Sequence, residues 1–192
     1  MTQLGFFFNM ERCVGCKTCQ VACKQRNQLP IGINYRTVYT YETGQYPNAR
    51  MYHFAATCNH CENPACVRSC PTGAMYKSED DGTVQHDDGV CIGCQQCVNS
   101  CPYGVPRYLP DQNISGKCYA CRDTREVDGS PTCVAACGQR AIEFGPLDEL
   151  QAAHPEAVCD IAALPESSAT GPSLLIQTKE AALETAFKEL RL

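Results

Sequence analysis

The arrangement of the cysteines constrains this chain more than any other feature of its sequence. Seventeen of the 192 residues are cysteine, and sixteen of them fall into four groups of four. The first and third groups have the spacing C-x2-C-x2-C-x3-C, and the second and fourth groups lengthen the middle interval to four and eleven residues. A device repeated in this way indicates four equivalent sites. In sequence order the groups are Cys13, Cys16, Cys19 and Cys23; Cys58, Cys61, Cys66 and Cys70; Cys91, Cys94, Cys97 and Cys101; and Cys118, Cys121, Cys133 and Cys137.

The spacing within each group is typical of a [4Fe–4S] cluster site. Three cysteines on a tight loop can wrap one cubane, and Gly15 and Gly93 lie in such loops, where the backbone must come close to the cluster. In the two-cluster ferredoxin pattern the fourth cysteine of each group ligates the other cluster. Pro71 and Pro102 directly follow two of these fourth cysteines. The sequence therefore predicts four [4Fe–4S] clusters with exchanged fourth ligands.

Three other uses of the cysteines are weaker. Disulfides would not require the repeated spacing, and catalytic thiols would not require sixteen residues. Four zinc sites are the main rival, but zinc ribbons use two distant C-x2-C pairs, which only the fourth group approaches. Cys159 is the remaining cysteine, and its apolar neighbours favour a small packed side chain. His60, inside the second group, could hydrogen-bond a cluster sulfur, but we do not expect it to be a ligand.

Composition and charge exclude several classes of function. A net charge of -5 and the lack of any Lys/Arg-rich run argue against nucleic-acid binding. The apolar runs are shorter than the ~18 residues of a membrane span. Residues 1–9 contain three phenylalanines but no signal-peptide pattern, and they predict a first strand. We therefore expect no membrane span and no export signal in the chain itself.

Local patterns predict short elements around the cysteine groups. An Asp-Gly turn favours a hairpin of 74–77 with 83–86, and two aromatic-rich segments, 35–41 and 51–55, predict a hairpin within the insertion 24–57. The later part of the chain predicts a strand, a short helix, a polar linker and an amphipathic helix, at 141–144, 147–153, 165–172 and 179–192 respectively.

Four segments carry a family resemblance. They are GFFFNMERCVGCKTCQVAC from Gly5, CNHCENPACVRSCPTGAM from Cys58, CIGCQQCVNSCPYGVPRY from Cys91 and KCYACRD from Lys117. Over roughly residues 4–150 the chain resembles the iron–sulfur electron-transfer subunit of dimethyl sulfoxide reductase, whose relatives serve other molybdopterin oxidoreductases. Some relatives replace the third cysteine of the third group and hold a [3Fe–4S] cluster. Cys97 is present here, so we expect four cubanes. Lys24 and Gly138 stand where the pattern has proline after the fourth cysteine, which affects the turn but not the ligands.

The resemblance implies an α+β fold made of two ferredoxin-like double-cluster units. One unit comprises residues 1–57 and 110–150, with the hairpin inserted at 24–57, and the other comprises residues 58–109. Residues 151–192 form a C-terminal extension that docks or packs. Ligation would cross between the first and fourth groups and between the second and third. The four implied ligand sets are Cys13, Cys16, Cys19 and Cys137; Cys118, Cys121, Cys133 and Cys23; Cys58, Cys61, Cys66 and Cys101; and Cys91, Cys94, Cys97 and Cys70.

The resemblance also implies a function and partners. The chain would relay single electrons between a membrane quinol-reactive subunit and a molybdopterin catalytic subunit in anaerobic respiration. It would have no catalytic residues of its own. Its place would be the periplasmic face, reached with a twin-arginine partner, or alternatively the cytoplasm. A polyferredoxin subunit of a hydrogenase, formate or other soluble redox complex is the alternative function.

Overall fold

The phenylalanine-rich first strand lies at the centre of the larger apolar core. The structure, a computed structural model, describes residues 2–190. Strand β1 (Leu4–Asn9) lies between β8 (Ile142–Pro146), which is antiparallel to it, and β9 (Leu174–Gln177), which is parallel. Alternate side chains of a strand point to opposite faces. Phe7 accordingly packs with Leu150 of helix α6 (Leu147–Ala153), and Phe6 and Phe8 pack on the opposite side.

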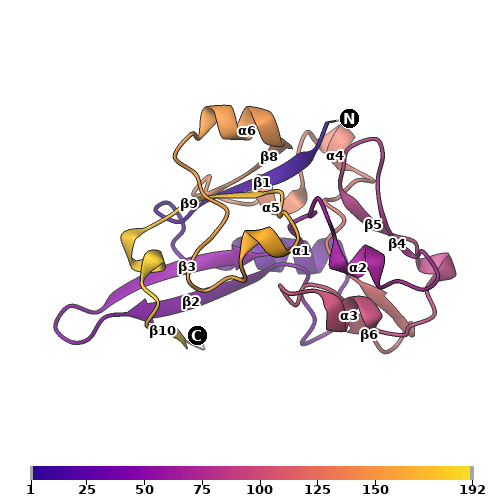
Figure 1. The fold of residues 1–192 in the computed structure, drawn as a ribbon, viewed down its shortest axis with the longest axis horizontal. Coiled ribbons are helices and arrows are strands. Elements are labelled where there is room, and N and C mark those ends of the chain that lie inside the picture. The colour runs from indigo at the N-terminus through magenta and orange to yellow at the C-terminus, as the bar shows by residue number, and fades with distance from the viewer. Residues whose placement is uncertain (1, 191–192) are drawn as a thin grey trace.

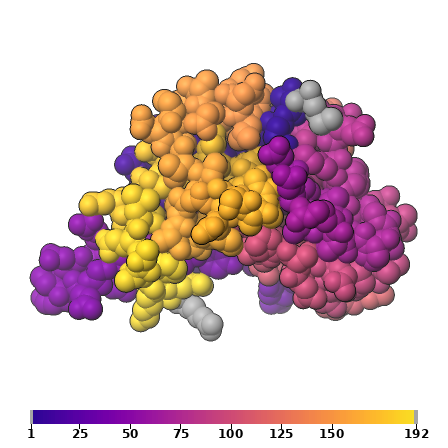
Figure 2. Space-filling model, viewed as in Figure 1, coloured from indigo at the N-terminus to yellow at the C-terminus, as the bar shows by residue number. Residues whose placement is uncertain are grey.

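A long hairpin forms the second layer. Strands β2 (Thr37–Thr43) and β3 (Arg50–Ala56) pair antiparallel from Thr37↔Ala56 to Thr43↔Arg50. Tyr52 is fully buried and stacks on Tyr41, with ring centroids 5.1 Å apart. The hairpin runs beneath β1 and its tip extends beyond the rest of the molecule (Figures 1 and 2). The predicted insertion hairpin is therefore confirmed.

Short helices carry the third cysteine of each group. They are α1 (Thr18–Arg26), α2 (Ala65–Arg68), α3 (Gln96–Ser100) and α5 (Thr132–Ala135), and α4 (Arg125–Asp128) lies between the two halves of the fourth group. Helix α1 packs against α5, and α2 packs against α3. The helices thus bring the first cysteine group to the fourth and the second group to the third.

Two small hairpins flank these helices. Strands β4 (Met75–Lys77) and β5 (Val84–His86) pair antiparallel, as predicted, and β6 (Arg107–Leu109) pairs with β7 (Ile114–Gly116). The first turn is fixed by Asp81, whose Oδ1 accepts hydrogen bonds from the backbone nitrogen and hydroxyl of Thr83 at 3.0 and 2.7 Å. A 3-10 turn, η1 (Asp88–Val90), leads into the third cysteine group.

The last segment of the chain differs from its prediction. Residues 179–190 form the 3-10 turn η3 (Glu180–Leu183) and strand β10 (Phe187–Leu190) in place of an amphipathic helix, and the predicted helix's last two positions lie outside the described residues. Strand β10 pairs with the free edge of β2, and Phe187 meets the Tyr41 ring edge-on at 5.5 Å. A short isolated helix is marginal in water. Pairing with an existing strand supplies both backbone hydrogen bonds and aromatic contact.

The predicted linker at 165–172 contains the 3-10 turn η2 (Ser167–Ala169) and packs on the second cysteine group, where Glu62 and Asn63 donate backbone hydrogen bonds to Gly171 and Thr170. The α+β fold class is confirmed, as are the first strand and the strand and helix around residues 141–153. The division into two double-cluster units stays a prediction. Among residues 2–190, no helix is both long and apolar enough to cross a membrane.

The packing of β9 generates a stability prediction. Ile176 is fully buried against β1, so Ile176→Ala should lower the free energy of unfolding by about 2–5 kcal/mol. Ile31 is 99% exposed, so Ile31→Ala should change it by less than ~0.5 kcal/mol. Denaturant titration of anaerobically purified protein, followed by circular dichroism, measures both values. Equal losses would show that Ile176 is not a core residue.

Candidate metal centres

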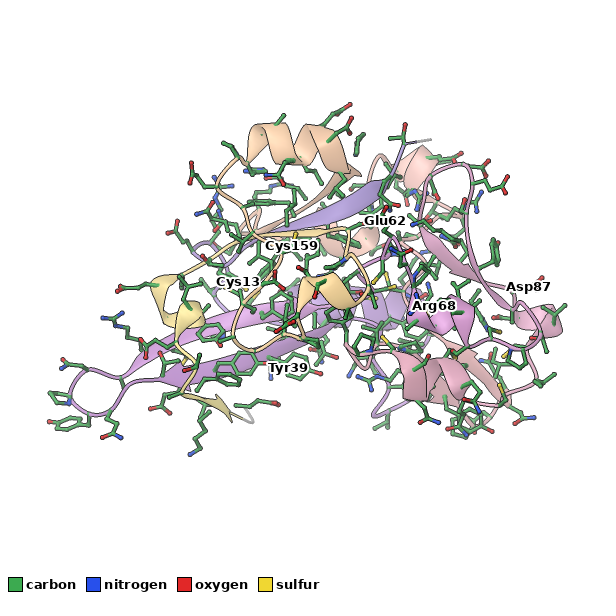
Figure 3. All side chains as sticks on the ribbon, in the orientation of Figure 1. Cys13, Tyr39, Glu62, Arg68, Asp87 and Cys159 are labelled. Carbon is green, nitrogen blue, oxygen red and sulfur yellow. The ribbon has the colours of Figure 1, made fainter. Side chains whose placement is uncertain are left out.

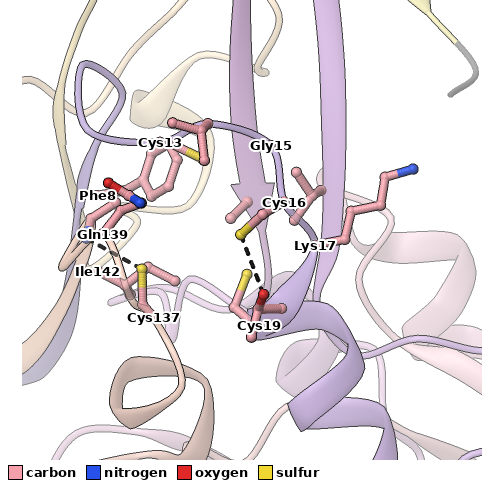
Figure 4. Close-up of a pocket in the computed structure, with 14 residues that line it drawn as sticks. Phe8, Cys13, Gly15, Cys16, Lys17, Cys19, Cys137, Gln139 and Ile142 are labelled. Atoms are coloured by element: carbon pink, nitrogen blue, oxygen red, sulfur yellow. Dashed lines mark hydrogen bonds between the residues drawn. The ribbon is translucent and has the colours of Figure 1, made fainter.

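Three cysteines of the first group and the last cysteine of the fourth surround one hollow. We name this set pocket I: Cys13, Cys16, Cys19 and Cys137, around a space of about 340 Å³. Figure 4 shows the four sulfur atoms pointing into this space from the 13–19 loop and from the end of α5. Four thiolates around one zinc ion would instead meet ~2.3 Å from a single point. Among the described residues, no three His, Cys, Asp or Glu side chains form a group fitted to a single ion.

Two further hollows have the same composition. Pocket II, of about 310 Å³, is lined by Cys23, Cys118, Cys121 and Cys133. Pocket III, of about 360 Å³, is lined by Cys58, Cys61, Cys66 and Cys101. In both, three cysteines come from one group and the fourth from its partner group. The structure thus brings together the same three quartets that the family resemblance implies.

The fourth set is less fully assembled. We name it set IV: Cys70, Cys91, Cys94 and Cys97. Burial, opposed by hydrogen bonds and reinforced by the neighbouring Cys70 and Cys91 thiols, raises the pKa of Cys97. Cys97 and Cys70 also belong to one apolar cluster with Cys66 of pocket III. Cys94 is exposed, and its place in set IV rests on the sequence pattern.

The four sets lie in series. Cys19 of pocket I and Cys23 and Cys133 of pocket II share one apolar cluster, whereas Cys118 of pocket II packs with Cys58 of pocket III. Cys66 of pocket III packs in turn with Cys97 of set IV. Of the sixteen cysteines, only Cys16 and Cys94 are exposed, and they belong to the two end sets. The order is therefore I, II, III, IV, with the interior pockets closed and the two ends near solvent.

Hydrogen-bond donors point at several of the sulfur atoms. The backbone nitrogen of Ala141 donates to Cys137 Sγ at 3.3 Å, and that of Met75 donates to Cys70 Sγ at 3.4 Å. The Thr170 hydroxyl donates to Cys61 Sγ at 3.2 Å. Donors of this kind stabilise the negative sulfur atoms of a buried cluster. The donor set therefore fits a cluster held by thiolates.

Burial works against bare thiolates in these pockets. It raises the pKa of Cys58 to about 12 and the pKa values of Cys19 and Cys66 to about 11, although nearby cations oppose the shift. The cause is that an apolar environment disfavours the charged form. A metal must therefore displace these protons, and its positive charge replaces what water no longer supplies.

Two buried cations adjoin the pockets. Arg36, which is 2% exposed, lies beside cysteines of pockets I and II, and its charge lowers the pKa of Cys133 against the larger effect of burial. Lys117, 3% exposed, lines pocket III, and its Nζ donates to the carbonyl oxygens of Val84 and Cys118. Sequence reasoning missed Arg36, Lys117 and Thr170. No local pattern marks Arg36 or Thr170, although Lys117 directly precedes Cys118.

The two side chains that the sequence set apart lie away from the ligand positions. Cys159 is half-buried beside β9 and packs against the Phe7 side of the sheet, away from Cys13 (Figure 3). His60 is fully buried, and its Nδ1 accepts a hydrogen bond from the backbone nitrogen of Val84 at 3.0 Å. Its Nε2 is buried with no hydrogen-bond partner among the described residues.

Comparisons with known proteins agree on the type of cofactor. A family model described as a 4Fe-4S dicluster domain matches residues 49–147, and one described as a 4Fe-4S binding domain matches residues 10–35. A chain of the anaerobic dimethyl sulfoxide reductase of Escherichia coli (strain K12) is 41% identical over 184 residues, covering 92% of the present chain and 89% of that protein.

Two relatives belong to other sulfur-compound oxidoreductases. Thiosulfate reductase electron transfer subunit PhsB of Salmonella typhi is 46% identical over 144 residues, covering 72% of this chain and 73% of that protein. A sulfite dehydrogenase subunit of Allochromatium vinosum is 39% identical over 166 residues, covering 76% and 69%. The similarity thus extends across subunits of complexes with different substrates.

The loop of pocket I generates a prediction about metal content. Gly15 has φ +68°, and a Cβ there would lie 2.6 Å from the His53 ring, which is held by a 2.9 Å hydrogen bond to Thr40. Gly15→Ala should therefore displace the loop and cost about four iron atoms per chain. Gly104 also has positive φ, but a Cβ there meets nothing within 4 Å, so Gly104→Ala should keep its iron. Full iron content in Gly15→Ala, by metal analysis, would refute the close-approach argument.

Proposed function

This chain belongs to a family of iron–sulfur electron-transfer subunits, in which it is similar to a chain of anaerobic dimethyl sulfoxide reductase, and we propose that it relays electrons through four [4Fe–4S] clusters. The observation that carries the proposal is the series of cysteine sets with exposed members only at its two ends. A relay needs closely spaced redox sites inside and access for partners at each end. This arrangement of the thiols meets both needs.

We assign the ligands by set: pocket I, pocket II, pocket III and set IV each hold one cluster. When bound, the clusters supply one-electron redox chemistry at potentials tuned by hydrogen bonds, charge and solvent exposure. The chain's own residues hold the thiolates in place, direct N–H and O–H donors at them, and exclude water from pockets II and III. These residues also place the two end sets where another subunit can reach them.

The proposed partners are a molybdopterin catalytic subunit at the pocket I end and a quinol-reactive membrane subunit at the set IV end. The names of the relatives support a multi-subunit setting, because they are called chains or subunits of reductases and a dehydrogenase. They favour this setting over a hydrogenase or formate polyferredoxin. Electrons would run from quinol to the catalytic subunit, or in reverse in an oxidising complex. We place the assembled complex at the periplasmic face of the membrane, with the cytoplasm as the alternative.

We propose that chemistry on the terminal substrate belongs to the catalytic partner. The side chains around the pockets are thiols, hydrogen-bond donors and buried cations, all arranged toward sulfur. The isolated chain should therefore accept and donate electrons without turning over a small substrate.

The number and type of metal ions give a direct test. Anaerobically purified protein should contain about sixteen iron and sixteen acid-labile sulfide atoms per chain, as four cubanes require. Plasma emission spectrometry and sulfide analysis measure both. Stoichiometric zinc in protein that is natively folded would defeat the proposal.

The exchange of fourth ligands gives a second test. Cys137→Ser and Cys13→Ser should perturb the same electron paramagnetic resonance component, because both residues line pocket I. Cys23→Ser should perturb a different component, that of pocket II. Cys159→Ser is the control and should leave the whole spectrum unchanged. A Cys137→Ser spectrum that matches Cys121→Ser would mean that the fourth group keeps its own last cysteine.

A further inference from the structure

We propose that Arg36 is a shared electrostatic positioning residue, whose permanent positive charge raises the reduction potentials of pockets I and II together. The proposal rests on the proposed function, because it concerns clusters bound in those pockets. It adds a residue outside the cysteine motifs to the machinery of the relay.

The first observation is how Arg36 is held. It directly precedes β2 and is 2% exposed. Its Nη1 donates to the carbonyl oxygen of Ala55 at 2.8 Å, and its Cζ lies 5.0 Å from the centroid of the Phe6 ring. The guanidinium is therefore fixed between the hairpin and the central strand, at the junction of the two layers.

The second observation is what the rest of the guanidinium lacks. Its Nε and Nη2 atoms are buried with no hydrogen-bond partner among the described residues, and within residues 2–190 no carboxylate forms a salt bridge with it. An unpaired charge in an apolar interior is very costly. Arg36 therefore requires an anion that side-chain carboxylates do not provide.

The third observation identifies that anion. Burial by itself would lower the pKa of Arg36, but the surrounding sulfur groups outweigh it and raise the pKa. Those groups are Cys133, Cys118 and Cys23 of pocket II and Cys19 of pocket I. The negative charge that compensates Arg36 thus comes from two neighbouring pockets at once.

The effect on redox equilibria follows from charge. Reduction takes one electron from the reductant with no proton, and changes the charge of four thiolates plus cubane from about −2 to about −3. A fixed positive charge stabilises the more negative state more strongly, because the attraction scales with the product of charges. Arg36 should therefore favour the reduced form in both pockets. Pocket III has its own cation, Lys117, and serves as an internal reference.

The test compares full-length variants by redox titration monitored by electron paramagnetic resonance, with dithionite as reductant and ferricyanide as oxidant. Arg36→Gln removes the charge but keeps a donor for Ala55. It should lower two of the four midpoint potentials, each by about tenfold in the equilibrium constant, which is ~59 mV for a one-electron couple. The other two potentials should stay unchanged. Iron content, measured on the same samples, should match that of the wild type.

Two controls separate charge from packing and from net charge. Arg36→Lys keeps the charge without the planar fork and should hold all four potentials near the wild-type values. Arg50 lies on the hairpin, half-exposed and 3.0 Å from Glu180, so Arg50→Gln removes an equal charge at a distance and should shift nothing.

Each result has a defined meaning. Wild-type potentials in Arg36→Gln would overturn the proposal, as would an equal shift of all four. If Arg36→Gln fails to load iron, Arg36→Lys decides: loading with wild-type potentials supports the role of charge, and failure to load overturns it. A wild-type chain without any cluster signal would instead defeat the proposed function.

Discussion

The negative charge of thiolates in an apolar interior is the constraint on which the rest of this structure depends. Burial raises the pKa of Cys58 to about 12, which disfavours the form of the thiol that binds metal. Iron offsets this cost at the centre of each hollow, and amides, hydroxyls, Arg36 and Lys117 offset it from outside. The short helices and left-handed loop residues place these groups. The fold is thus organised around anionic sites.

The apolar core is unevenly distributed around these sites. Around β1, β2, β3 and β9 it contains phenylalanine, tyrosine and isoleucine side chains that pack on one another. Between residues 58 and 118 the buried clusters consist largely of cysteines with Met75, Val84 and Val105. Small domains with little apolar core need other cross-links. The two parts of the chain should therefore depend on iron to different degrees.

Much of this arrangement could be predicted from local sequence, and the failures have a common cause. Phe6–Phe8 and the Asp-Gly turn at 81–82 act through near neighbours, so β1 and the β4–β5 hairpin were predictable. The apolar spacing at 182–190 fits a helix, but the free edge of β2, distant in sequence, makes it a strand. Arg36 and Thr170 meet their sulfur neighbours only after folding. Spacing predicted an exchange of fourth cysteines, and the partner groups came from family resemblance.

Hydrogen exchange after anaerobic removal of iron tests the central claim most directly, namely that metal bound by buried thiolates organises the fold. Peptides across residues 58–118 should lose nearly all protection in the iron-free chain. Peptides covering β1 and β9 should retain more of theirs, because their core is made of apolar side chains. Unchanged protection across 58–118 in iron-free protein would contradict the account, because that region would then be stable without its metal.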